Sequence, residues 1–300
     1  MWFGTKRGVS RLENGQWTSW APGDGLAGSQ AIDMLEARDG SIWAVFHAFG
    51  DTTVPGSGIS RFDGDNWHPI ELPPTAADQP WDVGHIVEST DGALWVSAWG
   101  RGVLRYDGSA WRLFTTADGL SGLNAWDLEA TEDGAVWVSY SGPGGGQGLN
   151  RFDGTSWTTY APGGSQDWQS MWQAPDGALW TGGQGALARF DGHRWQMYDL
   201  SELMSTVMPQ MAVQPLVGLA LRDGSMWLKV GQAAARFEPA GLNPTRYRHP
   251  DRLFGGYEDA AGGVWFHTDH AAVYHQDGRW LAHTADDGFL DGDVYGAWQA

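Results

Sequence analysis

The chain has 300 residues, 42% of them hydrophobic, with no cysteine and a net charge of −18. The lack of cysteine excludes disulfide scaffolds, thiol nucleophiles and thiolate metal sites, and the acidity disfavours binding to nucleic acid or to anionic membranes. No apolar run reaches 18 residues, so we expect no direct membrane insertion, and the opening residues 1–8 carry no signal-peptide pattern.

The first predicted element is a short strand at Trp2–Thr5, which matches the second half of a phrase repeated later in the chain. That phrase is D-G-x-x-W, and a degenerate form of it ends at Trp265. The intact copies begin at Asp39, Asp91, Asp133, Asp176 and Asp223.

A second phrase, R-[FY]-D-G-x-x-W, alternates with the first. A looser copy begins at Arg11, and eroded copies begin at Arg236 and Tyr274. The clear copies begin at Arg61, Arg105, Arg151 and Arg189. A period of about 40 residues is typical of stacked or circular repeat folds.

One unit predicts four short strands, at 125–130, 136–138, 149–152 and 157–160. Asp-Gly pairs join the strands, because a tight hairpin turn needs a residue with positive φ. Only 200–213 could hold a helical turn, and we interpret it as a long loop insertion.

Seven such units predict an all-β fold, a seven-bladed β-propeller in which residues 1–300 form a single domain. The C-terminal VYGAWQA at 294–300 resembles QSMWQA at 169–174, which precedes an Asp-Gly turn. We therefore expect 294–300 to provide the innermost strand of the blade that begins at Trp2, which would close the ring and leave no open sheet edge.

The repeated aromatic residues are predicted to be structural. Thirteen tryptophans lie in register in the two phrases, and large aromatic residues at recurring positions are typical of the packing between repeats. We expect Phe152 and Trp157 to pack between adjacent blades.

The two phrases resemble the repeat of the two-component regulator propeller family, whose unit combines D-G-L-S-x-N, D-x-x-G-x-[LV]-W and G-[LV]-x-R-[FY]-D-G. Residues 118–124, 132–138 and 148–154 give nearly the whole unit, and the resemblance covers almost all of the chain. It implies a sensor module of bacterial signalling proteins, usually extracytoplasmic (periplasmic or secreted), and several members are taken to read oligosaccharides. The likeness to streptogramin lyase propellers is weaker.

A ring of polar residues is predicted at the mouth of the central channel. It is found by counting nine residues back from the first residue of each D-G-x-x-W phrase, and the last two members rest on degenerate copies. The ring consists of Gln30, Asp82, Asn124, Asp167, Gln214, Arg252 and Asp293. These residues could contact a ligand or could cap strands and hold channel water.

Tryptophans outside the repeat are the second indication of a binding site. Aromatic faces beside polar groups suit stacking on sugar rings or other flat ligands. Trp172 and Trp298 are expected to pack between blades. The candidate ligand contacts are Trp81, Trp99, Trp126 and Trp168, with Arg101 in the same loops, and packing between blades is the alternative role for these four tryptophans.

An enzymatic alternative rests on histidine. A His, Arg and carboxylate set could remove a proton beside a uronate and support β-elimination by a polysaccharide lyase or hydrolase. The candidates are His47, His85, His249, His267 and His270, with Arg246, Arg248 and Arg252. His267 and His270 with Asp269 give only a weak metal signal, and we expect no cofactor or metal. A third possibility is a protein-interaction scaffold, with a signalling partner or adjoining domain.

Overall fold

The computed structural model describes residues 1–47, 57–75, 80–142, 148–164, 168–183, 186–200, 217–230, 233–237, 245–248, 253–268, 271–284, 287 and 294–298. These residues fall into two compact units. The first unit comprises Met1–Glu88, Tyr106–Trp111 and Phe254–Ala300, and the second comprises Ser89–Arg105 and Arg112–Leu253.

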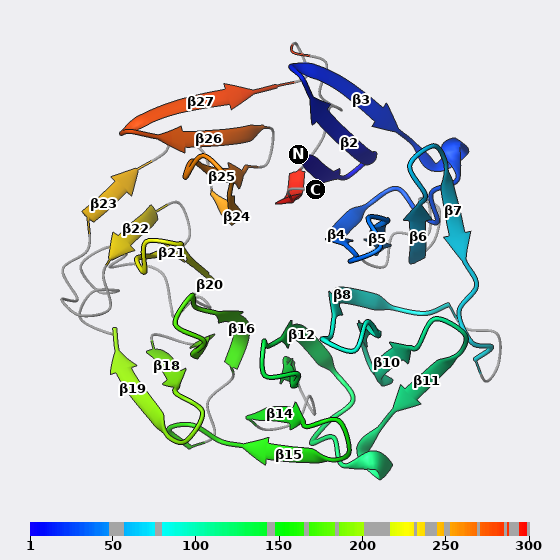
Figure 1. The fold of residues 1–300 in the computed structure, drawn as a ribbon, viewed down its shortest axis with the longest axis vertical. Coiled ribbons are helices and arrows are strands. Elements are labelled where there is room, and N and C mark those ends of the chain that lie inside the picture. Colours follow the sequence, from blue (N-terminus) through cyan, green and yellow to red (C-terminus); the bar gives the residue numbers. More distant parts are fainter. Residues whose placement is uncertain are drawn as a thin grey trace. The chain divides into compact units, whose positions relative to one another are not determined.

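Four-stranded antiparallel sheets build both units (Figure 1). In the first unit the sheets are β28 (Val294–Trp298), β1 (Trp2–Thr5), β2 (Gly8–Glu13) and β3 (Gln16–Trp20); β4 (Ala31–Glu36), β5 (Ile42–Phe46), β6 (Gly58–Phe62) and β7 (Trp67–Ile70); and β24 (Phe254–Glu258), β25 (Val264–His267), β26 (Ala272–Gln276) and β27 (Arg279–His283).

In the second unit the complete sheets are β12 (Ala125–Ala130), β13 (Val136–Tyr140), β14 (Leu149–Phe152) and β15 (Trp157–Tyr160); β16 (Trp168–Gln173), β17 (Leu179–Gly183), β18 (Ala186–Phe190) and β19 (Trp195–Asp199); and β20 (Val217–Ala220), β21 (Met226–Val230), β22 (Ala233–Phe237) and β23 (Thr245–Arg248). A further sheet, whose strands divide between the units, contains β8 (Val83–Glu88), β9 (Leu94–Ala98), β10 (Gly102–Tyr106) and β11 (Trp111–Phe114).

The fold is therefore an all-β β-propeller with four-stranded antiparallel blades, as the repeat predicts. Two short 3-10 helices are η1 (Pro22–Asp24) and η3 (Thr116–Asp118). The strands predicted at 125–130, 149–152 and 157–160 have the expected bounds, and the strand at 136 extends to Tyr140. The predicted insertion at 200–213 lies almost wholly outside the described residues.

The C-terminal strand completes the N-terminal sheet. β28 pairs antiparallel with β1 and lies beside it (Figure 1), with Trp2 opposite Trp298 and Gly4 opposite Gly296. Within the first unit β28 also contacts β4 and β24, the first strands of the two other complete sheets. The sheet order β28-β1-β2-β3 confirms that the end of the chain supplies the missing strand of the blade that begins at Trp2.

Aromatic clusters fill the space between neighbouring sheets. Trp95 is 1% exposed and stacks with Phe114 of its own sheet at 5.4 Å between ring centroids. Phe152 and Trp157, from the next sheet along the chain, lie 5.2 and 5.9 Å from the same Trp95 ring. Phe152 and Trp157 therefore pack between adjacent blades, as predicted, and the recurring phrases are parts of the scaffold.

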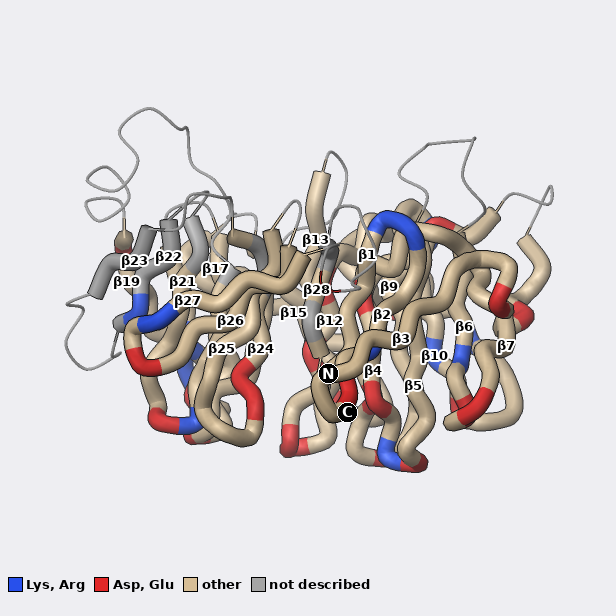
Figure 2. Tube along the Cα trace, turned by 90° about the horizontal axis from the view of Figure 1, so that it is seen from above, with Lys and Arg blue, Asp and Glu red and all other residues tan. Residues whose placement is uncertain are grey.

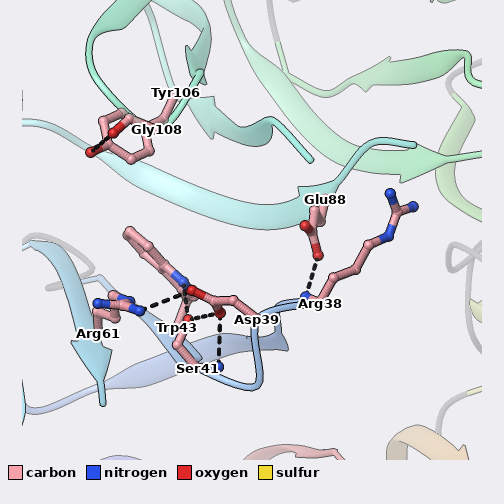
Figure 3. Close-up of polar contacts among 8 residues, drawn as sticks. All are labelled: Arg38, Asp39, Ser41, Trp43, Arg61, Glu88, Tyr106 and Gly108. Atoms are coloured by element: carbon pink, nitrogen blue, oxygen red, sulfur yellow. Dashed lines mark hydrogen bonds and ion pairs between the residues drawn. The ribbon is translucent and has the colours of Figure 1, made fainter. Parts of the chain in front are cut away.

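A polar network holds the Asp-Gly turn at Asp39 (Figure 3). Asp39 Oδ1 accepts hydrogen bonds from the backbone N–H and the hydroxyl of Ser41, and the Ser41 hydroxyl accepts the indole N–H of Trp43. Arg61 donates to Asp39 Oδ2 at 2.9 Å, and Gly40 has the predicted positive φ of 80°. These bonds, those from Ser41 first, hold the pKa of Asp39 below its usual value.

The same ion pair recurs in other sheets. Its further copies are Arg105 with Asp91, Arg151 with Asp133, Arg189 with Asp176 and Arg236 with Asp223. Figure 2 shows acidic and basic residues beside one another in turns at the strand ends. The acidic residues of these turns are thus part of the scaffold.

Candidate functional site

Two indole rings meet where the first strand of a sheet begins, in the second unit. Trp99 follows β9, and Trp126 is the second residue of β12. Their ring centroids are 5.4 Å apart with an interplanar angle of 77°, so the contact is edge to face. Trp126 is 42% exposed, although it lies on a strand that contacts β9 and β16 of the neighbouring sheets. We call the end of a sheet away from its Asp-Gly-x-x-Trp turn the loop end.

Asn124 completes this cluster at the loop end. Its Oδ1 lies 4.0 Å from where a Cβ on Gly100 would be, and its Nδ2 lies 4.0 Å from the equivalent point on Gly142. The same point on Gly142 is 3.3 Å from two atoms of the Trp99 ring. Gly142 has a φ of 80°, a backbone conformation that glycine adopts without strain. Its lack of a side chain also leaves room for the ring of Trp99.

The backbone fixes the loops that carry these side chains. Ser141 donates its N–H to the carbonyl of Asn124 at 3.3 Å, and Gly102 donates to the carbonyl of Leu123 at 2.9 Å. Arg101 lies in the tight turn after β9, where its N–H bonds the carbonyl of Ala98 at 3.0 Å. Arg101 is half-buried and shares this turn with Trp99.

Two carboxylates follow this cluster along β12, farther from the loop end. Asp127 Oδ2 accepts the N–H of Met171 at 2.7 Å, and Glu129 Oε1 accepts the N–H of Gln173 at 2.8 Å. They give hydrogen-bond acceptors to the backbone of β16, which belongs to the next sheet and would otherwise present unpaired donors. Burial raises the pKa of Glu129 to about 8; the N–H of Gln173 opposes this shift, and the charge of Asp127 adds to it.

The first unit carries histidine and carboxylate side chains near its loop ends. His47 follows β5, donates its backbone N–H to the carbonyl of Gln30 at 3.1 Å, and pairs through Nε2 with Asp82 Oδ1. Deeper along the same strands, Asp33 Oδ2 lies 3.3 Å from His85 Nδ1 and accepts the N–H of Ile86 at 2.8 Å. Two histidine–carboxylate pairs thus join β4 and β5 to the segment around β8.

The remaining predicted tryptophans are less accessible. Trp81 is 8% exposed and donates its indole N–H to the carbonyl of Pro73 at 2.7 Å. Trp168 is 1% exposed and donates to the carbonyl of Pro162. Trp172 belongs to a core cluster with Leu187 and Met226, and Trp298 packs against the cluster around Trp2.

Several predicted residues cannot be placed. Asp167, Gln214, Arg252, Asp293, His249 and His270 lie outside the described residues, and the side chains of Arg246 and Arg248 do as well. His267 is described, and it is buried at the end of β25. Among the described residues no group of three or more His, Asp or Glu side chains could hold a metal ion.

The structure brings Trp99, Asn124 and Trp126 together, and separately Gln30, His47 and Asp82. Counting nine residues back from each turn selects the start of a first strand, so it did not select Asp33, Asp127 or Glu129 within the strands. The available signal was a carboxylate inside an otherwise apolar strand, because such a group needs a specific partner.

Comparison with protein-family models finds no match. No curated protein matches either. In the part of the chain that the structure describes, no helix is long and apolar enough to cross a membrane.

Solved structures do match. The extracellular domain of a hybrid two-component system from B. thetaiotaomicron is 16% identical, with a TM-score of 0.69; the match covers 88% of this chain and 37% of that one. A virginiamycin B lyase from Staphylococcus aureus, described as a catalytically inactive histidine-to-alanine variant with quinupristin, is 17% identical with a TM-score of 0.66, over 85% of this chain and 84% of that one.

A third match, described as YCF48 bound to D1 peptide, has 14% identity and a TM-score of 0.61, and covers 87% of this chain and 83% of that one. The present chain thus spans less than half of the sensor chain that it matches. At these identities the likeness shows the fold. The chain is a β-propeller whose fold is shared by extracellular sensor domains, by lyases and by a peptide-binding protein.

Proposed function

We propose that the chain is a ligand-binding β-propeller of the sensor type, and that Trp99, Asn124 and Trp126 contact the ligand. The proposal includes a single seven-bladed ring closed by β28, an extracytoplasmic location, and an oligosaccharide or similar small molecule as the ligand. Shared fold with extracellular sensor domains supports the general role, and the repeat phrases support it independently.

The exposure of Trp126 carries the proposal. An indole ring that only filled space between sheets would be buried, as Trp95, Trp137 and Trp180 are at 1 to 2% exposed. Trp126 instead keeps 42% of its surface exposed while its position is set by contact with Trp99. A rigid aromatic surface held open beside an amide is typical of a small-molecule site.

The geometry favours a ring that stacks on one face only. The backbone at Gly142 runs close to the Trp99 ring, and this ring meets Trp126 at an interplanar angle of 77°, so the pair does not form a parallel-sided slot. A pyranose ring has an apolar face of C–H groups for Trp126 and hydroxyl groups at its edge for the amide of Asn124. An amide both donates and accepts hydrogen bonds, which suits hydroxyl recognition.

A second candidate function is catalysis in the first unit, and the pairing of His47 with Asp82 favours it. A carboxylate bonded to one imidazole nitrogen can orient the ring and stabilise its protonated form, which is the arrangement of a general base. The His47 side chain is 19% exposed and that of Asp82 is 45% exposed, so the pair lies near solvent. This candidate predicts product formation that depends on His47.

The test is a thermal melt of the protein with neutral and with uronic-acid oligosaccharides, followed by calorimetric titration. Ligand that binds the folded state raises Tm with concentration. Trp126→Ala and Trp99→Ala should weaken binding at least about tenfold, whereas Leu281→Ala, at a 56% exposed position on β27, should leave it unchanged.

Incubating the same samples and analysing the sugars tests the enzymatic alternative. Cleavage that is lost in His47→Ala would favour catalysis over sensing. If no sugar raises Tm, the oligosaccharide proposal is wrong, and a protein partner at the loop ends becomes the candidate to pursue.

A further inference from the structure

Asn150 is the centre of a buried hydrogen-bond network in the second unit. It is 0% exposed on β14, and its Oδ1 accepts bonds from the N–H and the hydroxyl of Ser121 at 2.8 and 2.7 Å and from the hydroxyl of Tyr140 at 2.7 Å. Its Nδ2 donates to the carbonyl of Gly119 and to the hydroxyl of Thr159. A buried amide with five hydrogen bonds to four residues is strongly oriented.

The sheet formed by β4 to β7 shares one part of this network. Ser60 lies just before the Arg of its phrase, as Asn150 does, and its hydroxyl accepts the N–H of Ala27 at 2.8 Å and donates to the carbonyl of Gly25 at 3.3 Å. Ala27 and Gly25 hold the places in their loop that Ser121 and Gly119 hold in theirs. A polar side chain at this position therefore anchors the loop before the first strand in both sheets.

The link to Tyr140 is particular to Asn150. The residue at the place of Tyr140 in the other sheet is Phe46, which has no hydroxyl group. Tyr140 is buried at 3% exposure, so its hydroxyl needs a partner, and the longer side chain of Asn150 reaches it. Burial also raises the pKa of Tyr140, so the hydroxyl stays a neutral donor.

Both segments tied to Asn150 end at the aromatic cluster. Ser121 lies three residues before Asn124 and five before Trp126, and Tyr140 lies two residues before Gly142. A Cβ on Gly142 would lie 3.3 Å from two atoms of the Trp99 ring and 4.0 Å from Nδ2 of Asn124, so Gly142 lies beside both side chains.

We propose that Asn150 is a positioning residue for the ligand site. It does not touch the ligand, but fixes the loop that carries Asn124 and Trp126 and the segment that supports Trp99. This inference rests on the proposed function for its effect on affinity, while its effect on the loops stands without it.

The test compares Asn150→Ser and Tyr140→Phe with Ser60→Ala, the matched control in the other unit. Asn150→Ser introduces the residue found at the equivalent position, Ser60, and removes the hydrogen bond from Tyr140 to Asn150. Tyr140→Phe introduces the residue found at its equivalent position, Phe46. Hydrogen exchange measured by mass spectrometry reports the loops without any ligand. We expect Asn150→Ser to lower protection in 119–126 and 139–142 by about tenfold, and Tyr140→Phe to do so mainly in 139–142. Ser60→Ala should change 25–32 only.

Affinity is then measured with the oligosaccharide that raises the Tm of the unmodified protein. Asn150→Ser should weaken binding at least about tenfold, and Ser60→Ala less than twofold. Unchanged exchange in 119–126 for Asn150→Ser overturns the proposal, as does a loss of affinity no larger than that of Ser60→Ala. If no oligosaccharide binds the unmodified protein, the proposed function fails, and the exchange experiment alone decides the positioning role. If Asn150→Ser does not fold, Tyr140→Phe is decisive on 139–142.

Discussion

Replacing Gly218 with alanine tests how tightly the sheets of the second unit pack. A Cβ at Gly218 would lie 2.2 Å from the Cη2 and Cζ2 atoms of Trp172 and 2.6 Å from its Cε2. Carbon atoms in contact are about 3.5 to 4.0 Å apart, so the indole would have to move by more than about 1 Å. Trp172 packs against Leu187 and Met226, which are 0% and 1% exposed, so little free space is present.

We expect this overpacking to cost about 3 kcal/mol, at the upper end for one added methyl group in a packed core. With an unfolding entropy of about 2 cal/mol/K per residue, this lowers Tm by about 5 °C if the chain unfolds as one cooperative unit. Differential scanning calorimetry provides the measurement. Gly23→Ala is the control, because a Cβ there meets no atom within 4 Å.

The double variant Gly218→Ala/Trp172→Leu separates the clash from other effects. Removing the indole makes room for the methyl group, so the two changes should cost less together than the sum of each alone. A Tm within about 1 °C of the unmodified protein for Gly218→Ala, or strict additivity in the double variant, would refute the packing of Trp172 over Gly218.

Two further predictions concern charge and chain closure. The pKa of Glu129 is about 8 in the folded protein against 4.5 as the ordinary value, so its stabilisation is complete below pH 4.5 and is lost progressively as pH rises to about 8. Glu129→Gln should therefore gain about 4 kcal/mol relative to the unmodified protein between pH 5 and 9 in urea titrations. Glu132→Gln, at an exposed position, is the control, and equal pH profiles for the two variants would contradict the prediction. Deleting 294–300 removes the partner of β1 and should lower Tm by more than about 10 °C or prevent folding. Deleting only 299–300, which leaves β28 in place, should not have this effect. Equal melting temperatures for the two truncations would show that β28 does not hold the fold together.

The class of fold and its repeat could be predicted from the sequence because the phrases are local. An Asp-Gly pair specifies a hairpin turn through the positive φ of glycine. Trp137 lies at a fixed distance after the first Asp-Gly pair of its unit, and Arg151 and Phe152 lie directly before the second pair. The strands of one unit can therefore be predicted without knowledge of the other units. The strand bounds of that unit and the role of 294–300 as a partner of β1 follow from the same local comparison.

The composition of the candidate site depended on tertiary structure. Trp126 and Trp168 look alike in the sequence, since both lie at the start of a first strand, yet Trp126 is 42% exposed and Trp168 is 1% exposed. The difference arises because Trp168 finds a partner in the carbonyl of Pro162 and a place in the core, whereas Trp126 makes an edge-to-face contact with Trp99.

The sequence by itself determined an acidic, cysteine-free propeller scaffold with tryptophan at its repeat positions. Only the tertiary structure decided that Trp99, Asn124 and Trp126 meet at one loop end, that His47 pairs with Asp82, and that Asn150 joins Ser121 to Tyr140. The physical reason is range. Turn conformation and the alternation of a strand are set by neighbouring residues, whereas the exposure of an indole and the partners of a buried amide are set by residues that the fold brings from other strands.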